Sequence, residues 1–202
     1  MVLYRLAALL NRLLVGLLFR PRVRGREHVP ASGGLVLAPS HLSAFDPQAV
    51  AYALGLRPLR NMAKNQLFRH PLLGPIVRAL GGFPAYDGDG LAGGVSAAVA
   101  FARAGQAVVI FPEGRRRRPE SEHRPRTGAA RTALEAGVPL VPAAVRGTEG
   151  WRRLRRWTIA FGPPVPLHVP ARAEPERAAP EATRRLWQAI GELEAALDAE
   201  PA

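Results

Sequence analysis

The feature that most constrains the fold is a strand–loop–helix unit at residues 34–54. Residues 35–38 form a short apolar run typical of a buried strand, and a proline ends it. Asp46 directly precedes Pro47, a pair typical of an N-cap followed by the first helical position. The unit therefore places His41 at the carboxyl end of a strand and Asp46 at a helix entrance. Open α/β sheets hold their chemistry at the carboxyl ends of parallel strands.

Apolar runs and amphipathic stretches alternate along the rest of the chain. The strand candidates are residues 35–38, 58–63, 81–86, 107–111, 139–145 and 157–161, and the helix candidates are residues 47–54, 65–80, 95–104, 127–136 and 181–199. Prolines and a glycine must break or kink the helix candidate at 65–80. Strands that alternate with helices predict an α/β fold with a mostly parallel central sheet flanked by helices.

His41 and Asp46 together have the minimum equipment of a general base. A carboxylate can hold one ring nitrogen, fix the tautomer and stabilise the imidazolium that forms when the other nitrogen takes a proton. Asp46 also has a simpler explanation, because a helix cap accounts for an aspartate at this position. The two roles are compatible, since a carboxylate offers several acceptor positions.

Composition limits the kinds of site that the chain can build. A hydrophobic fraction of 48% over 202 residues fits one globular domain with a sizeable core. The absence of cysteine excludes disulfides, thiolate catalysis and thiolate metal sites, and five scattered histidines suggest no metal site. The net charge of +12, almost entirely from arginine, indicates attraction to phospholipid surfaces, phosphorylated substrates or nucleic acid without choosing among them.

The first twenty residues are rich in leucine but carry Arg5, Asn11 and Arg12. A helix that spans a bilayer needs about 20 mostly uncharged residues. Arg5 and Arg12 are seven residues apart and so share a helix face. We therefore expect an amphipathic helix lying in the bilayer surface, with its arginines near lipid phosphates. An ordinary helix packed on the domain is the alternative.

Further motifs lie downstream of His41. Phe111-Pro112-Glu113-Gly114 ends a strand candidate, and a later block runs through residues 128–142 to Arg146-Gly147-Thr148. Together with His41-Leu-Ser-Ala-Phe-Asp46, these blocks resemble those of the glycerolipid acyltransferases, in particular the bacterial lysophosphatidate acyltransferase group. Lys64 and Leu67-Phe68 are similar to the stretch that follows the first helix in that family. The resemblance covers roughly residues 24–165.

The resemblance implies transfer of a fatty acyl group from a thioester, either acyl-CoA or acyl carrier protein, to the free sn-2 hydroxyl of 1-acylglycerol-3-phosphate. His41 would remove the hydroxyl proton, and Asp46 would orient the imidazole and stabilise its positive charge. No covalent enzyme intermediate would be needed. Backbone N–H groups around Gly114 would stabilise the oxyanion. The substrate-binding residues would be Lys64, Phe111, Pro112, Glu113, Gly114, Arg115 and Arg116.

The sequence pattern together with the resemblance predicts how the chain is divided and where the protein acts. We expect residues 1–22 to form the membrane-association helix, residues 23–165 the catalytic domain, and residues 166–202 a proline-rich linker with a C-terminal amphipathic helix. No cofactor or metal is expected, because the acyl donor is a co-substrate. The expected partners are a membrane phospholipid surface and a lysophospholipid acceptor, with no nucleic acid. The expected location is the cytoplasmic face of the cell membrane, as a peripheral or monotopic protein.

The chain departs from the family pattern at two places. Residues 115–118 are four arginines where the family usually has Thr-Arg-Ser, so Arg116 keeps the basic position. Phe83 leads to Tyr86 and Asp87 where the family has an arginine thought to hold the phosphate of the acceptor. This second departure leaves both lysophosphatidate and another lysolipid as acceptors, with Arg115 or Arg117 as candidate replacements.

Three other classes of protein are the alternatives. A serine hydrolase needs Gly-x-Ser-x-Gly, which the stretch at 94–98 around Ser96 matches only in part, at the start of a helix candidate. A nucleic-acid-binding module could use the arginines at 115–118 and 152–156, although no signature of a nucleic-acid-binding fold accompanies them. A lipid-surface protein that kept the fold without catalysis is the third alternative.

Overall fold

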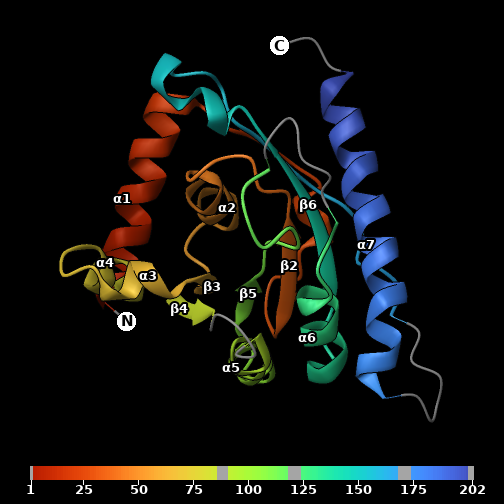
Figure 1. Cartoon of the computed structure of the whole chain (residues 1–202). Coiled ribbons are helices and arrows are strands. Elements are labelled where there is room, and N and C mark those ends of the chain that lie inside the picture. The colour runs from red at the N-terminus through yellow and green to blue at the C-terminus, as the bar shows by residue number, and fades with distance from the viewer. Residues whose placement is uncertain (1, 86–90, 118–123, 168–173, 200–202) are drawn as a thin grey trace.

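The computed structural model describes residues 2–85, 91–117, 124–167 and 174–199. Its strands are β1 Arg22–Arg24, β2 Leu35–Pro39, β3 Leu59–Lys64, β4 Gly82–Ala85, β5 Ala107–Val109, β6 Leu140–Arg146 and β7 Thr158–Phe161. Its α-helices are α1 Val2–Phe19, α2 Asp46–Leu54, α3 Asn65–Arg69, α4 Leu73–Ala79, α5 Leu91–Arg103, α6 Gly128–Ala136 and α7 Pro175–Asp198, and its 3₁₀ helices include η1 Arg26–His28 and η3 Thr148–Arg153. Figure 1 shows α1 and α7 on opposite sides of the sheet.

One seven-stranded sheet runs through the molecule in the order β1-β7-β6-β2-β5-β3-β4. β2 is parallel to both of its neighbours, β5 and β6, and β3 is parallel to β5 and β4. β7 is antiparallel to β6 and parallel to β1, so only this edge of the sheet runs in the opposite direction. The predicted α/β fold with a mostly parallel sheet is confirmed.

Two apolar layers cover the two faces of the sheet. Side chains alternate along a strand, so Leu35 and Leu37 of β2 face α1 and α2, whereas Val36 and Ala38 face α5, α6 and α7. All four side chains are fully buried. Burial on both faces explains why this strand reads as a continuous apolar run and not as an alternating pattern.

α1 packs on the first of these layers. Its Val15 and Phe19 are buried in the core, and the ring of Phe19 stacks on that of Trp157, with 3.8 Å between the ring centroids. The leucines on the other side of α1 are exposed to between 43 and 71%. Among the residues that the structure describes, no helix is long and apolar enough to cross a membrane.

The sequence-based boundaries fail at two places. Residues 22–24, for which no strand is predicted, form β1, because Val23 is the single apolar residue of this strand and leaves no recognisable pattern. The proline-rich linker expected to reach Pro180 ends earlier, because α7 already begins at Pro175. Pro175 occupies the first helical position, where a missing N–H group costs least, whereas Pro180 lies inside the helix, beside the buried Ala179.

The packing of α7 leads to a first prediction. Leu186 of α7 is fully buried among α6 and the sheet, and its truncation leaves a cavity. We expect Leu186→Ala to lower the free energy of unfolding by about 2–5 kcal/mol, measured by urea denaturation. Gln188→Ala, on the exposed side of the same helix, should change it by less than about 0.5 kcal/mol. Equal losses in the two variants would contradict the packing of α7 described here.

Candidate active site

The two residues of the predicted base lie in the segment that leads from β2 into α2. β2 ends at Pro39, and the fully buried Ser40 then accepts a hydrogen bond at Oγ from the backbone N–H of Val145 in β6, at 3.1 Å. This contact fixes where the chain leaves the sheet. His41 comes next, at the carboxyl end of the strand as expected, and Asp46 is the first residue of α2.

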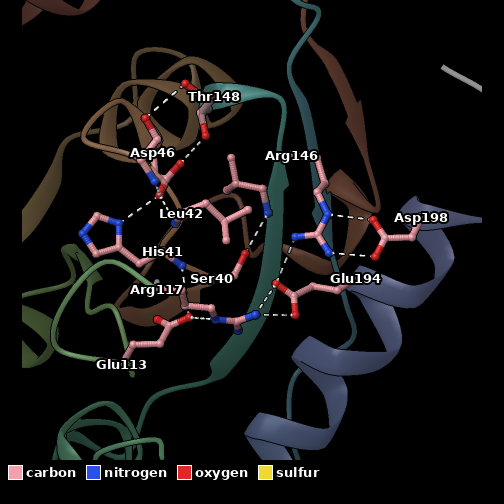
Figure 2. A network of polar contacts seen from close by, with 12 residues as sticks. Ser40, His41, Leu42, Asp46, Glu113, Arg117, Arg146, Thr148, Glu194 and Asp198 are labelled. Atoms are coloured by element: carbon pink, nitrogen blue, oxygen red, sulfur yellow. Dashed lines mark hydrogen bonds and ion pairs between the residues drawn. The ribbon is translucent and has the colours of Figure 1, made fainter. Parts of the chain in front are cut away.

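His41 and Asp46 are in direct contact (Figure 2). His41 Nδ1 lies 2.9 Å from Asp46 Oδ2, and the same oxygen accepts the backbone N–H groups of Leu42 at 2.6 Å and Ser43 at 2.8 Å. The other oxygen, Oδ1, accepts the hydroxyl of Thr148 at 2.5 Å. Asp46 is fully buried, so these donors replace the water that the carboxylate has lost.

The structure corrects one interpretation of Asp46. The N-cap position of α2 is occupied by Phe45, and no side chain caps the first turn. The carboxylate of Asp46 instead turns back toward the preceding loop, because three of its donors are there. The helix cap therefore does not explain this aspartate.

The contact with Asp46 sets the proton positions on His41. A carboxylate with no proton can only accept, so the imidazole donates from Nδ1–H and keeps the lone pair on Nε2. The His41 side chain is 18% exposed, and its ring stacks on Phe111 with 4.1 Å between centroids. Nε2 is thus the nitrogen that can take a proton from a substrate.

The Phe111–Gly114 motif lies beside this loop. β5 is the neighbour of β2 in the sheet, so the segments that follow the two strands meet at the same edge. Glu113 is buried, and its Oε1 accepts the backbone N–H of His41 at 3.1 Å. The structure therefore brings Phe111 and Glu113 together with His41.

Gly114 has a conformation that glycine adopts most readily. Its φ is +67°, and a Cβ placed there would lie 2.8 Å from Nε of Arg126. Its N–H group donates to the carbonyl of Phe111 at 3.0 Å, so the expected role of this particular N–H as an oxyanion donor does not fit. Arg126 is exposed and lies over Gly114, which places a basic side chain beside the motif that the sequence did not indicate.

The arginines after Gly114 point in different directions. Arg115 and Arg116 are exposed, as is Lys64 at the end of β3, and within the described residues none of the three forms an ion pair or side-chain hydrogen bond. Arg117 is directed inward, and its Nε lies 2.7 Å from Oε1 of Glu113. Arg118 and the departures at Tyr86 and Asp87 lie outside the described residues.

A polar network joins this loop to the C-terminal helix (Figure 2). Arg117 Nη1 lies 2.9 and 2.7 Å from the two carboxylate oxygens of Glu194 in α7. Arg146 Nη1 lies 3.3 Å from the same glutamate, and its Nε and Nη2 each bind Asp198 at 2.9 Å. The hydrogen bonds between Arg146 and Asp198 raise the pKa of the guanidinium and lower the pKa of the carboxyl.

An apolar pocket of about 200 Å³ opens next to the site. Phe111, Ala44 and Pro47 line it on the side of the segments that follow β2 and β5, and Tyr4 of α1 and Met62 of β3 are among the residues that line the rest. Burial raises the pKa of the Tyr4 hydroxyl, which donates to the carbonyl of Arg57. Phe111 thus touches both the imidazole and the pocket.

Neighbouring serines do not supply a nucleophile. Ser40 Oγ accepts the N–H of Val145, and Ser43 Oγ donates to the carbonyl of Thr148 at 3.1 Å while accepting the N–H of Phe45. Both side chains are buried and directed away from the imidazole lone pair. Ser96 lies within α5, not at a strand-to-helix turn, so it does not form the nucleophile elbow of a hydrolase.

The residues that the structure describes around this site include no cluster of metal ligands. Across the described part of the chain, no group of three or more histidine, aspartate or glutamate side chains could hold a metal ion. The site therefore consists of an oriented imidazole, a buried glutamate, exposed arginines and an apolar pocket. This set suits a proton transfer from a hydroxyl group to His41 beside a long apolar substituent.

Comparisons with known proteins agree with this arrangement. A family model described as Acyltransferase matches residues 20–146. A 1-acyl-sn-glycerol-3-phosphate acyltransferase of Bacillus subtilis is 29% identical over 205 residues, covering 96% of this chain and 98% of the relative. A protein of the same name from Borreliella burgdorferi is 26% identical over 132 residues, covering 64% of this chain and 52% of the relative.

A solved structure supports the fold. The crystal structure of the 1-acyl-sn-glycerophosphate acyltransferase PlsC from Thermotoga maritima matches with a TM-score of 0.65 and 20% sequence identity, covering 90% of this chain and 73% of that one. The family match spans the His41–Asp46 and Phe111–Gly114 motifs, from β1 to the end of β6. By this match the chain belongs to the acyltransferase family.

Proposed function

We propose that the protein transfers a fatty acyl group from an acyl thioester to the free sn-2 hydroxyl of 1-acylglycerol-3-phosphate, giving phosphatidic acid for phospholipid synthesis. The donor is acyl-CoA or acyl carrier protein, and no cofactor is needed. The observation that carries the proposal is His41, held by the buried Asp46 and stacked on Phe111 at the mouth of an apolar pocket. The names of the two relatives support the acceptor.

His41 acts as the base in this mechanism. Nε2 takes the proton of the acceptor hydroxyl while the oxygen attacks the thioester carbonyl carbon, and Asp46 stabilises the resulting imidazolium. The tetrahedral intermediate then breaks its carbon–sulfur bond. The leaving thiolate takes the proton from the imidazolium, so the products are an ester and a free thiol. A thiolate leaves readily, which makes an acyl-enzyme intermediate unnecessary.

Basic side chains around the motif suit the phosphate of the acceptor. Arg115, Arg116 and Arg126 are exposed near Gly114, and Lys64 is exposed at the end of β3. Guanidinium groups bind phosphate through paired hydrogen bonds, so the arginines are the stronger candidates. The negative charge of a lysophosphatidate headgroup would be attracted to this edge, where the described residues offer these cations no carboxylate partner.

The apolar pocket suits a fatty acyl chain. It lies between α1, α2 and β3, and its lining carries few polar groups. Because Phe111 lines the pocket and contacts the His41 ring, a chain inside it would bring its thioester to the imidazole. This placement supports the acyl chain as the pocket's occupant.

The exposed side of α1 suits the membrane surface that the substrate requires. Its leucines are among the most exposed in the protein, with Leu3 at 65% and Leu17 at 71%. The segment 151–156, which begins within η3, lies near the C-terminal end of α1 and presents Trp151, Leu154 and four exposed arginines. Apolar side chains beside cations match the interface of an anionic bilayer. The negative surface potential of the cytoplasmic leaflet would attract the arginines, which supports the cytoplasmic face of the membrane as the proposed location.

Purified protein tests the central proposal. We expect labelled acyl-CoA and lysophosphatidate to give labelled phosphatidic acid, with slower or no product from monoacylglycerol and from lysolipids without a terminal phosphate. His41→Ala should lower kcat by about 100- to 10,000-fold because the base is lost. His28→Ala, a histidine in η1, should keep the activity of the wild type. A fully active His41→Ala enzyme would exclude the mechanism. Faster acylation of another lysolipid would exclude lysophosphatidate as the preferred acceptor.

A pocket substitution tests the acyl-chain site. Ala51 of α2 lines the pocket, and Ala51→Phe would fill part of it. We expect the preferred acyl-CoA to become shorter, measured as kcat/KM over donors of increasing chain length. Ala196→Phe, on the exposed side of α7, is the control with the same change of size. An unchanged chain-length profile in Ala51→Phe would mean that the acyl chain binds elsewhere.

A vesicle assay tests the membrane surface. We expect the triple variant Leu6→Gln, Leu13→Gln and Leu17→Gln to lose co-sedimentation with vesicles of phosphatidylcholine and phosphatidylglycerol, because the apolar contact is lost. The control Ala195→Gln with Ala196→Gln changes exposed positions of α7 and should bind like the wild type. Retained binding of the triple variant would exclude α1 as the contact. Tight DNA binding without vesicle binding would favour the nucleic-acid alternative.

A further inference from the structure

Both backbone groups of His41 are held by the segment that carries the second motif. The N–H of His41 donates to Glu113 Oε1 at 3.1 Å, and the carbonyl of His41 accepts the N–H of Arg117 at 2.8 Å. The side chain of His41 is held separately, by Asp46. The direction of the imidazole therefore depends on the position of residues 113–117 as well as on the carboxylate.

Arg117 in turn connects this segment to α7. Its Nε binds Glu113 Oε1 at 2.7 Å, and its Nη1 binds both oxygens of Glu194 at 2.9 and 2.7 Å. The guanidinium also lies over the ring of Trp187 in α7, 4.7 Å from its centroid. The guanidinium of Arg117 thus bridges the carboxylates of Glu113 and Glu194, which lie far apart in the sequence (Figure 2).

The pairs are shielded from water. The side chains of Glu113, Glu194 and Arg117 are 1, 12 and 17% exposed. Ion pairs at this depth are screened little by salt, and removing one partner leaves a charge without compensation. Oε2 of Glu113 has no hydrogen-bond partner among the described residues. The carboxylate is therefore held through Oε1, by the guanidinium of Arg117 and the N–H of His41.

Glu194 is itself held from a second direction. Arg146, at the end of β6, donates to Glu194 Oε1 and is fixed on its other side by Asp198. Two guanidinium groups therefore converge on one carboxylate near the C-terminal end of α7. This arrangement holds the helix end in register with the sheet edge where the site lies.

We propose that Glu194 and Arg117 are positioning residues, through which the C-terminal helix holds the Phe111–Arg117 segment against the backbone of His41. The proposal rests on the proposed function for its kinetic test only. It also gives Arg117 a different task from that of Arg115 and Arg116, which face solvent. Neither positioning residue is expected to touch substrate. Their loss should therefore lower kcat and leave KM for both substrates nearly unchanged.

Kinetics on the full chain test the proposal. We expect Glu194→Gln, which keeps the size of the side chain and removes its charge, to lower kcat by about 10- to 100-fold because the imidazole is misplaced. KM for acyl-CoA and for lysophosphatidate should stay within about two-fold. Arg117→Gln should lower kcat similarly. The kcat of the double variant should be no lower than that of the less active single variant, because both changes break the same ion pair between Arg117 and Glu194.

The control is Glu192→Gln on the same helix. Glu192 is exposed and binds only Gln188 among the described residues, so the same change of charge should leave kcat unchanged. A wild-type kcat in Glu194→Gln would overturn the proposal, as would a rise of KM with kcat retained. A loss of activity that follows the unfolded fraction in thermal denaturation would also overturn it, since that result means a purely structural role.

A measurement without substrate separates this proposal from the proposed function. The Nδ1–H proton of His41 should give a downfield proton resonance in the wild type, absent from Asp46→Asn. Glu194→Gln should shift or broaden that resonance, whereas Glu192→Gln should leave it as it is. Arg117→Lys, which keeps the charge but cannot bridge both carboxylates, repeats the test where Glu194→Gln does not fold. An unchanged resonance in folded variants overturns the positioning role, even where no acyl transfer is found.

Discussion

The structure depends most on the buried carboxylate of Asp46. A charge without contact to water is stable only when protein donors replace its hydration, and four donors surround this one. Three of them come from the loop that follows β2, and the fourth is Thr148, at the start of η3. The carboxylate therefore fixes the loop, the entrance of α2 and the β6–β7 connection at one point. The orientation of His41 follows from that point.

A second set of charges holds the same loop from the other side of the sheet. α2 lies on the face covered by α1, whereas α7 lies on the opposite face, and Arg117, in the segment that follows β5, reaches Glu194 there. Glu113, between them, receives the N–H of His41. His41 is thus attached to helices on both faces through a chain of hydrogen bonds (Figure 2). Such attachment allows an imidazole to keep its direction without direct contact between the two helical layers.

The sequence predicted the parts of the site that depend on local pattern. An apolar run, a proline and an Asp-Pro pair predict a strand, a loop and a helix, and parallel strands bring the ends of β2 and β5 to one edge. It could not assign roles to Thr148 and Glu194, because their partners lie 102 and 77 residues away and a hydroxyl or glutamate carries no local signal of its partner. β1 was missed for a related reason, since its three residues are stabilised by pairing with β7 and not by their own pattern.

The position of α1 links the proposed membrane contact with the proposed acyl-chain pocket. Tyr4, Ala8 and Asn11 of this helix line the apolar pocket, whereas its leucines on the other side face outward. Removing the helix would open the pocket and would also remove the proposed membrane contact. A truncated protein would therefore lose activity whether α1 is needed for the pocket or for the membrane. Substitutions confined to the outward leucines leave the pocket lining in place and separate the two roles. In the proposed arrangement the pocket lies on the inner side of α1 and the bilayer on its outer side, so this one helix separates the lipid from the acyl-chain pocket.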